Sequence, residues 1–212
     1  MVADAVIQKA LDATDGISTD SRTARAGNLF FALKGECFDG HDFLKQALER
    51  GIKNFVVSDQ SKILPWMNNA AHFIWVSDTL KAYGDFAAIW RERFKIPAVA
   101  VTGSSGKTTV KELIAHLLSP HFKVLKNRGT ENNLVGVPKT LFCLEKNHAV
   151  LVVELGTNHP GEIDRLASLL TPDIGVITQI GSAHLEGLGS LEDVCREKLS
   201  LMNHLRKVGR FF

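Results

Sequence analysis

The stretch that decides the fold is VAVTGSSGKTT, from Val99 to Thr109. It starts as a short apolar strand, continues as a Gly/Ser loop and ends in Lys107 and Thr108, where an amphipathic segment begins. Glycines let backbone amides converge on anionic oxygens, and the N-terminus of a following helix adds positive partial charge. Lys107 is then able to reach terminal phosphates, and the Thr108 hydroxyl is placed to bind Mg²⁺. The order of strand, loop and helix predicts a site for a nucleoside triphosphate.

The spacing of this loop differs from that of the commonest phosphate-binding motif. A glycine five residues before Gly106 would fall at position 101, which is Val101. The match is instead to a shorter pattern, T-G-x-x-G-K-T-T, whose loop residues are Gly103, Ser104, Ser105 and Gly106. The alternative is a tight turn with a chance Gly-Lys-Thr, which does not explain the strand before it and the helix after it.

Composition limits the class of protein without identifying it. The chain has 212 residues, of which 45% are hydrophobic and 23% charged, and these values are typical of a soluble globular protein of one or two domains. A net charge of +2 gives no long-range reason to bind nucleic acid or an anionic membrane. Cys37, Cys143 and Cys195 are too far apart for a CxxC motif, and their odd number argues against a disulfide framework. Without a membrane-length apolar run or a signal-peptide pattern, we expect a cytoplasmic protein.

The expected order of secondary structure changes near Pro97, which predicts two domains, 1–96 and 97–212. Before it, short strands and turns precede a helix expected over 80–93. Beyond it, the continuously apolar runs AVAVT, AVLVVEL and IGVIT are typical of parallel strands buried on both faces. Helices with apolar faces at 110, 113, 114, 117 and at 163, 166, 167, 170 separate them. We therefore expect an α/β protein, with a small mixed N-terminal α/β domain before a P-loop-type parallel-sheet domain.

Polar side chains follow two of these strands, at the edge where open α/β sheets bind ligands. Glu154 ends the run AVLVVE, and an acid at that place suits Mg²⁺, directly or through water; the alternative is a capping or salt-bridging carboxylate. Asn158 and His159 follow in a loop, where substrate contact and turn formation are equally good interpretations. His184 and Glu186 come after the next strand. A lone histidine is more often structural, but this loop position favours a metal or phosphate role.

Lys198 and a pair of asparagines complete the candidate residues. Lys198 lies at the centre of a helical face whose apolar positions are 191, 194, 195, 201, 202 and 205. A buried ammonium needs an anionic partner or loses its charge, so the candidates are a phosphate contact and chemical modification of the amine. The alternative is a packed stem whose head reaches solvent. Asn132 and Asn133, before a helix expected near Gly136, suit hydroxyls and phosphates, although turn formation is the better interpretation.

The chain carries, in order, TGSSGKTT (102–109), TENNLVGVP (130–138), VELGTNHPGEI (153–163) and SAHLEGLGSLEDV (182–194). Together these segments resemble the central domain of the Mur ligase family. The upstream stretch DSRTARAGNLFFALKGECFDGHDF (20–43) resembles the N-terminal, uridine-nucleotide-binding domain of a member of that family. The resemblance covers nearly the whole chain from Asp20 onward, and motifs this numerous and ordered are specific to the family.

The resemblance implies an ATP-dependent amide ligase of peptidoglycan precursor synthesis. ATP would phosphorylate the terminal carboxylate of UDP-N-acetylmuramoyl-tripeptide, and the amine of D-alanyl-D-alanine would attack the acyl phosphate. A carboxylate that attacks ATP must overcome repulsion between anions, so cations and oriented amides have to surround the γ-phosphate. Lys107, the loop amides and Mg²⁺ would supply them. No nucleic acid or membrane partner is expected, and the protein is expected to be a monomer.

The resemblance also implies roles for single residues. Residues 103–109, through Thr109, would hold the nucleotide, with Asn133 near the nucleotide or the metal. Thr108 and Glu154 would serve a first Mg²⁺ and His184 a second. Lys198 matches the family lysine that becomes a carbamate, a change that turns a cation into an anion able to approach Mg²⁺. Substrate contacts would come from Ser21, Arg22, Asp39, Gly40, His41 and Asn158.

Two further function classes stay open at this point. One is a related ligase, either another Mur ligase or a folylpolyglutamate-synthase-like enzyme. The ligand preference of the N-terminal domain, for a UDP-muramoyl-peptide or for folate, would distinguish these enzymes. The other is a non-catalytic nucleotide-binding module, which would bind ligand without releasing ADP. Family members have three domains and are about twice as long as this chain. We therefore expect an incomplete central domain, no C-terminal domain, and no turnover by this polypeptide alone.

Overall fold

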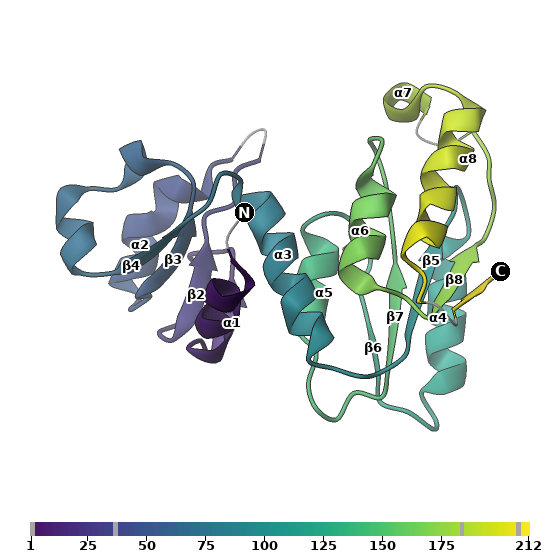
Figure 1. Ribbon diagram of the computed structural model, residues 1–212, viewed down its shortest axis with the longest axis horizontal. Helices are drawn as coiled ribbons and strands as arrows, with labels where there is room; N and C mark the ends of the chain where they lie inside the picture. The colour runs from purple at the N-terminus through teal and green to yellow at the C-terminus, as the bar shows by residue number, and fades with distance from the viewer. Residues whose placement is uncertain (1–2, 36–37, 183–184, 207–208) are drawn as a thin grey trace. The chain divides into compact units, whose positions relative to one another are not determined.

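The computed structural model describes residues 3–35, 38–182, 185–206 and 209–212 and forms two compact units, residues 1–89 and 90–212 (Figure 1). Unit 1 contains α1 (Asp4–Asp12), β1 (Gly16–Ser18), β2 (Asn28–Phe31), α2 (Leu44–Glu49), β3 (Asn54–Val57), β4 (His72–Trp75) and most of α3 (Thr79–Glu92). Unit 2 contains β5 (Ala98–Thr102), α4 (Lys107–Leu118), β6 (Val124–Lys126), α5 (Gly136–Phe142), β7 (Val150–Glu154), α6 (Glu162–Leu170), β8 (Ile174–Ile177), α7 (Leu185–Leu188), α8 (Leu191–Leu199) and β9 (Arg210–Phe211). Short 3₁₀ helices are η1 (Gly40–Phe43), η2 (Gln60–Lys62), η3 (Pro65–Asn69) and η4 (Ser200–His204).

The sheet of unit 1 has the order β1-β2-β3-β4, and every pair in it is parallel. Because side chains alternate along a strand, β2 supplies residues to both faces. Phe30 faces the side covered by α2 and contacts Phe55 edge to face at 5.9 Å. Phe31 faces the opposite side, where its ring lies 5.1 Å from Tyr83 and 5.0 Å from Phe86 of α3. Aromatic contacts on both faces thus form the core of this unit.

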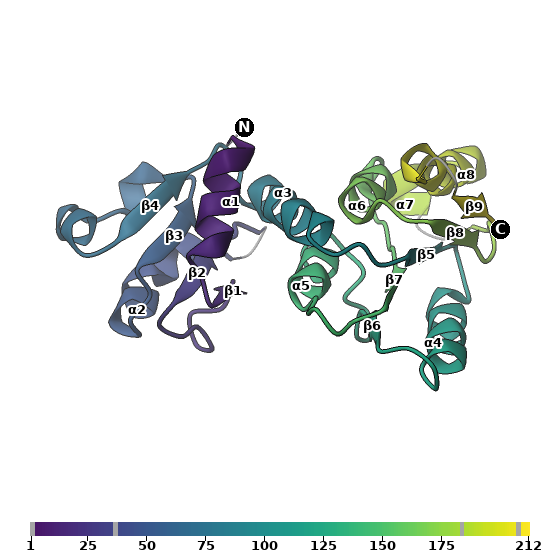
Figure 2. The ribbon, with the colours of Figure 1, turned by 60° about the horizontal axis from the view of Figure 1, so that its bottom comes forward.

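The sheet of unit 2 has the order β6-β7-β5-β8-β9 and is also wholly parallel. Every residue of β5 and β7 is buried, as their continuously apolar sequences predict. The chain passes from β5 outward to β6 and then returns across the sheet, so right-handed crossovers place helices on both faces. Figure 2 shows α4 on one face and α5, α6 and α8 on the other. The carboxyl end of β5 is therefore the topological switch point, where such sheets bind ligands.

The apolar face predicted for α4 is partly wrong. Leu113 and Leu117, which the helical periodicity assigns to that face, are 53% and 67% exposed. Val110 and Ile114 pack against the core of β5 and β7, as predicted, and Lys111 and Ala115 beside them are buried. Because the covered face is centred on these four positions, residues 113 and 117 point away from it.

The face predicted for α8 is also only partly correct. Val194, Lys198 and Leu201 are buried, whereas Leu191 and Met202 are exposed. Leu191 is the first residue of the helix, and Met202 lies in the 3₁₀ turn that follows, where the α-helical period no longer holds. Across the described part of the chain, the helices are too short or too polar to cross a bilayer.

Candidate functional site

The loop between β5 and α4 packs against the segment that follows β8. Gly103 has φ +147°, and a Cβ atom at this residue would lie 2.1 Å from the Thr178 hydroxyl oxygen. The Ser104 amide donates to the Gln179 carbonyl at 2.8 Å. Gly106, at φ +76°, then turns the chain into α4. Glycine is favoured at both positions because residues with a Cβ atom rarely adopt these φ values. The loop is thus held at the switch point of the sheet.

The two loop serines point their hydroxyls toward the same segment. The Ser104 hydroxyl donates to the Gly181 carbonyl at 2.9 Å and accepts from the Gly181 amide at 3.0 Å. The Ser105 hydroxyl donates to the side-chain oxygen of Gln179. These bonds tie the loop after β5 to the loop after β8, so the shape of one depends on the other.

Positive charge is concentrated at the start of α4. The Lys107 ammonium donates to the Gly103 carbonyl at 2.9 Å, which holds the cation over the loop. The first amides of the helix lack intrahelical acceptors and attract anions. Thr109 is exposed on the same turn. Loop, helix N-terminus and lysine together are suited to bind phosphate groups.

Both carboxylate oxygens of buried Glu154 accept hydrogen bonds. The Thr108 hydroxyl donates to Oε2 at 2.7 Å, and the Asn132 side-chain amide donates to Oε1 at 2.8 Å. Parallel pairing of β5 with β7 brings the ends of both strands to one edge, which is why these side chains meet. The expectation that Glu154 lies beside the start of α4 is confirmed.

The oxygen atoms of Thr108 and Glu154 fit a hard divalent cation. Mg²⁺ prefers oxygen ligands, and one or two carboxylates usually hold it together with phosphates and water. Among the residues that the structure describes, no group of three or more His, Cys, Asp or Glu side chains could hold a metal ion. The residues present therefore suit a site completed by phosphate oxygens rather than a cage made only of protein.

Lys198 is almost completely inaccessible, with 1% of its surface exposed. Burial is the main reason that the pKa of its ammonium falls to about 8; the charge of Lys107 acts in the same direction, and Glu197 acts against it. The prediction that this lysine lies on an inward face is confirmed. A substantial fraction of the amine is therefore neutral at mildly alkaline pH.

Glu197, next to Lys198 on α8, caps another helix. Its carboxylate accepts from the Gly161 amide at 2.7 Å and from the Ile163 amide at 2.7 Å, at the N-terminus of α6. A carboxylate there also interacts favourably with the helix dipole. The residue thereby ties α8 to the loop between β7 and α6.

Asn132 and Asn133 differ in what they contact. The Asn133 side-chain oxygen accepts from the amides of Val135 at 3.1 Å and Gly136 at 2.9 Å, which caps the start of α5. The turn-forming interpretation therefore describes its oxygen, while Asn132 is the residue whose amide reaches Glu154. The family resemblance, not the sequence pattern, implied a place near the nucleotide or the metal for Asn133.

The candidate residue Asn158 lies in the loop between β7 and α6. The Asn158 backbone amide donates to the Glu162 carboxylate at 2.6 Å, and its side chain is exposed. Gly187 of α7 approaches closely, since a Cβ atom there would lie 2.0 Å from the Asn158 carbonyl oxygen. His184, the predicted second metal ligand, lies outside the described residues, and its neighbour Glu186 is exposed.

In unit 1, Ser21 and Arg22 follow β1 and differ in exposure. Ser21 is buried, and its hydroxyl donates to the Gln46 side-chain oxygen of α2 at 2.6 Å. The Arg22 side chain is 79% exposed and donates to the Asp20 carboxylate. These bonds lower the pKa of Asp20 to about 2. The guanidinium of Arg22 is presented to solvent, whereas Ser21 anchors the turn.

The stretch from Asp39 to His41 is tightly fixed. The His41 ring is buried; its Nδ1 donates to the Asp39 carboxylate at 2.6 Å, and its Nε2 accepts from the Ser58 amide at 2.9 Å. Burial would raise the pKa of Asp39, but the hydrogen bonds from the His41 backbone and ring outweigh it and hold that pKa below its usual value. A Cβ atom on Gly40 would lie 2.7 Å from the Leu33 amide nitrogen. His41 and Gly40 therefore shape the loop.

Replacing His41 with alanine is expected to destabilise unit 1. The change removes the bonds to Asp39 and Ser58 and leaves a cavity, so the free energy of unfolding should fall by about 1–3 kcal/mol. Urea unfolding of the two proteins measures the difference. Arg22→Ala is the matched control, since an exposed ion pair contributes about 0–1 kcal/mol. Equal losses in the two variants would contradict the assigned role of the buried ring.

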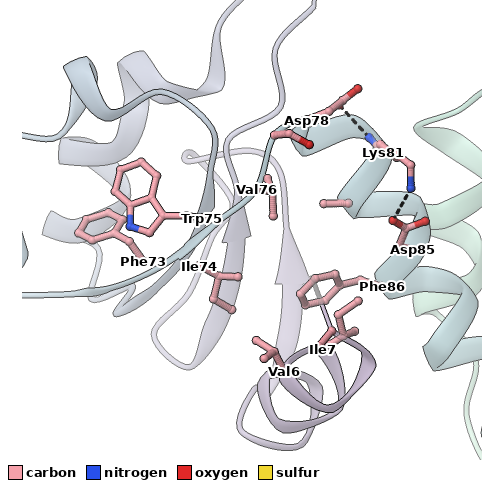
Figure 3. Close-up of a pocket in the computed structure, with 13 residues that line it drawn as sticks. Val6, Ile7, Phe73, Ile74, Trp75, Val76, Asp78, Lys81, Asp85 and Phe86 are labelled. Carbon is pink, nitrogen blue, oxygen red and sulfur yellow. Dashed lines mark hydrogen bonds and ion pairs between the residues drawn. The ribbon is translucent and has the colours of Figure 1, made fainter. Parts of the chain in front are cut away.

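A separate cavity of about 630 Å³ lies in unit 1 between α1, β4 and the start of α3 (Figure 3). Val6, Ile74 and Phe86 are among the apolar side chains that line it. At its polar end, Lys81 donates to the Asp85 carboxylate at 2.9 Å. The substrate residues predicted from the sequence do not line this cavity, which is therefore distinct from the candidate site.

Three buried polar residues that support the site in unit 2 were missed by the sequence patterns: Lys111, Asn127 and Glu197. Asn127 had a usable signal, because it follows the strand ending at Lys126 and so lies at the same sheet edge as Glu154. A single lysine on an amphipathic helix ordinarily faces water, and nothing in the pattern sets Lys111 apart.

The sequence of this chain matches two family models and several curated proteins. A family model described as the Mur ligase middle domain matches residues 101–212, and one described as the Mur ligase family catalytic domain matches 14–91. Proteins named UDP-N-acetylmuramoyl-tripeptide–D-alanyl-D-alanine ligase are similar to this chain. The one from Synechocystis is 45% identical over 90% of this chain and 41% of its own length, and the one from Escherichia coli is 42% identical over 92% and 42%. The chain thus spans about two fifths of the curated relatives it matches.

Solved structures agree with the sequence comparison. MurF from Acinetobacter baumannii superposes with a TM-score of 0.88 at 36% identity, over 97% of this chain and 47% of that one. MurF ligase from Thermotoga maritima in complex with ADP gives a TM-score of 0.85 at 31% identity, over 94% and 45%. Because the middle-domain match alone covers more than half of the residues, the chain belongs to the Mur ligase family.

Proposed function

We propose that this chain supplies the nucleotide site and the UDP-sugar-binding unit of an ATP-dependent ligase that joins D-alanyl-D-alanine to UDP-N-acetylmuramoyl-tripeptide. The observation that carries the proposal is the meeting of the β5–α4 loop, Lys107, Thr108 and Glu154 at one edge of the sheet. The substrate assignment comes from the names of relatives that are 40–45% identical to this chain. We assign residues 1–96 to the UDP-muramoyl-peptide domain and 97–212 to the ATP-binding domain.

The loop and the start of α4 would bind the phosphates of ATP. The Ser104 amide is already bonded to the Gln179 carbonyl, so the phosphates would be bound by other amides of the loop and of the helix N-terminus. Lys107, now on the Gly103 carbonyl, is able to turn toward the β- and γ-phosphates. Thr108 and Glu154 would hold Mg²⁺, with Asn132 orienting the carboxylate and Asn133 shaping the loop. When bound, the ion neutralises phosphate charge and polarises the γ-phosphoryl group.

The chemistry then follows from the bound groups. A carboxylate oxygen of the tripeptide attacks the γ-phosphorus and ADP leaves, giving an acyl phosphate. The amine nitrogen of D-alanyl-D-alanine attacks the acyl carbon, phosphate leaves and the nitrogen releases a proton. Lys107 and the loop amides stabilise the charge that develops on the phosphoryl oxygens. Positioning and electrostatics, rather than a protein nucleophile, carry the reaction.

Lys198 is proposed to carry a carbamate. Its neutral amine forms a bond to the carbon of CO₂ and releases one proton, which replaces a buried cation with an anion. The depressed pKa supports this reaction because only the neutral amine is nucleophilic. The resulting carboxylate would add an oxygen ligand to a metal site that the described residues leave poor in acids. His184 is proposed for a second Mg²⁺.

The uridine nucleotide is proposed to bind unit 1. The exposed Arg22 guanidinium would contact the diphosphate, while Ser21, Asp39, Gly40 and His41 would hold the loops that surround it. Asn158, exposed beside the catalytic edge, would contact the peptide. The ligase is proposed to act in the cytoplasm as a monomer, without nucleic acid or a membrane.

Calorimetric titration of this chain with Mg²⁺ and ATP tests the nucleotide site. We expect Lys107→Met to weaken ATP binding by about 10- to 150-fold, because hydrogen bonds from a charged group contribute about 1.5–3 kcal/mol. Binding of UDP-N-acetylmuramoyl-tripeptide should stay unchanged in this variant. Lys146→Met, on the exposed loop before β7, is the control.

The outcomes separate the alternatives. Failure of the wild-type chain to bind ATP, or equal binding by Lys107→Met, would show that the loop is not the nucleotide site. Binding of ATP without binding of the UDP-tripeptide would favour a different ligase of the same fold. Binding of both ligands by a full-length protein that releases no ADP with D-alanyl-D-alanine would favour a non-catalytic module.

A further inference from the structure

Lys111 is a buried cation one turn beyond Lys107 on α4. Its side chain is 0% exposed, and its ammonium donates to the Asn127 carbonyl at 2.9 Å and lies 3.1 Å from the Glu112 carboxylate. Burying an ammonium is costly unless it is paired and hydrogen-bonded. The Glu112 side chain is 45% exposed, so the hydrogen bond to the Asn127 carbonyl is the contact that holds the ammonium inside the protein.

Asn127, whose carbonyl accepts that bond, uses its whole side chain on the loop before α5 and on the end of β7. Its Nδ2 donates to the Glu131 carbonyl at 2.9 Å and to the Glu154 carbonyl at 3.0 Å, and its Oδ1 accepts from the Glu154 amide at 2.9 Å. One side chain therefore brackets the backbone of Glu154 on both sides. The residue itself is fully buried, so water does not compete for these bonds.

Two connections thus join α4 to the end of β7. The direct one is the 2.7 Å bond from the Thr108 hydroxyl to the Glu154 carboxylate. The indirect one runs from the Lys111 ammonium to the Asn127 carbonyl, and from the Asn127 side chain to the Glu154 backbone. Thr108 and Lys111 are three residues apart on one helix and so lie on the same side of it. The bond from Lys111 to Asn127 therefore fixes the position of α4 relative to β7, and with it the distance between the Thr108 hydroxyl and the Glu154 carboxylate.

We infer that Lys111 and Asn127 are positioning residues that hold the Glu154 carboxylate against the Thr108 hydroxyl and so determine how strongly Mg²⁺ enhances nucleotide binding. This inference rests on the proposed nucleotide and Mg²⁺ site. Neither residue touches the nucleotide in this assignment, since both are 0% exposed. Their loss therefore affects the metal-linked part of the affinity and leaves the phosphate contacts of the loop in place.

The test measures ADP affinity of the full chain by calorimetry, once with EDTA and once with saturating Mg²⁺. The ratio of the two dissociation constants is the Mg²⁺ enhancement. We expect Lys111→Met and Asn127→Ala each to reduce this enhancement at least about tenfold while the affinity in EDTA changes less than about threefold. The double variant should lose no more than the larger single loss, because both act through one connection.

Control variants separate positioning from general destabilisation. Lys123→Met removes an exposed lysine of unit 2 that pairs with Glu145 and should leave the enhancement unchanged. Glu154→Gln should remove the enhancement and serves as the reference for its complete loss. Asn127→Asp keeps the acceptor for the Glu154 amide and loses the donor to its carbonyl. It gives an intermediate enhancement and replaces Asn127→Ala if that variant does not fold.

The results distinguish this inference from the proposed function. A wild-type chain that does not bind ADP, or whose ADP affinity is the same with and without Mg²⁺, contradicts the proposed site and the inference with it. A wild-type enhancement that persists in Lys111→Met and in both Asn127 variants overturns the inference alone. Parallel loss of affinity with and without Mg²⁺ also overturns it, because that pattern indicates a damaged loop rather than a displaced carboxylate.

Discussion

Replacing Gly103 with alanine is expected to lower the free energy of unfolding of unit 2 by about 2–6 kcal/mol, from backbone strain and overpacking together. The new Cβ atom would lie 2.1 Å from the Thr178 hydroxyl oxygen and 3.1 Å from the Gln179 amide nitrogen. Rotating the Thr178 side chain away would break the bond that its hydroxyl donates to the Ser105 carbonyl at 2.5 Å. Moving the loop instead would break the bond from the Ser104 amide to the Gln179 carbonyl. Nucleotide binding should be lost in either case.

Gly106→Ala is the matched control for this change. Gly106 also has positive φ, at +76°, but the nearest atom to a Cβ there is the Thr178 Cβ at 3.9 Å. Only the conformational cost applies, about 1–2 kcal/mol. Urea unfolding and ADP titration of the two variants measure both effects. Similar losses of stability in the two would show that close packing against the segment after β8 does not constrain the loop.

Replacing Lys198 with methionine is expected to raise stability at neutral pH and to remove a pH dependence. The folded-state pKa of about 8 compares with about 10.4 for an unperturbed lysine, a difference that corresponds to about 3 kcal/mol. Below about pH 8 the ammonium is charged in both states, and the folded state carries the full cost of burying it. Between about pH 8 and pH 10.4 the unfolded state binds more protons, so the wild-type protein gains stability as the pH rises. The variant should therefore be up to about 3 kcal/mol more stable at pH 7, with the difference vanishing near pH 10.

Urea unfolding of wild type and Lys198→Met in CO₂-free buffer, at several pH values, tests this expectation. Only the difference between the two proteins matters, since it cancels the titration of other groups. With carbon-13-labelled bicarbonate, the wild type should also give a carbamate resonance that the variant lacks. A difference in stability that stays constant with pH would mean that Lys198 keeps an ordinary pKa. A missing resonance would exclude the carbamate and leave the buried amine in place.

The strands and the phosphate-binding loop could be predicted because their signals are local. The five apolar residues of AVAVT are enough to indicate both the length of a strand and its burial on two faces. Gly103 and Gly106 indicate the turn by themselves, whatever segments pack around it. Glu154 could be placed beside Thr108 because strand ends in a parallel sheet share an edge. Lys198 was found from helical periodicity, and its burial is confirmed. The roles of these residues stay predictions.

The position of Asn127 after a strand was a usable signal, but its hydrogen-bond partners and those of Lys111 could not be predicted, because they depend on pairing between distant segments. Asn127 meets Glu154 only because β6 pairs with β7, and Lys111 meets Asn127 only because α4 packs across both strands. The exposed Leu113 and Leu117 have the same cause, since the rotation of α4 on the sheet is set by tertiary packing and not by its own period. The hydrogen bonds of Asn133 to the start of α5 are, in contrast, local, and they agree with the turn-forming interpretation of the sequence.

The strand orders of the two sheets have a consequence for synthesis on the ribosome. In unit 1 each strand pairs with the one made just before it, so the sheet is able to grow as the chain emerges. In unit 2, β5 pairs with β7 and β8, and β6 pairs with β7, so neither early strand has a partner until Val150–Glu154 has been made. The loop between β5 and α4 therefore leaves the ribosome after an unpaired apolar strand, and for about 50 residues of elongation that strand is exposed to aggregation.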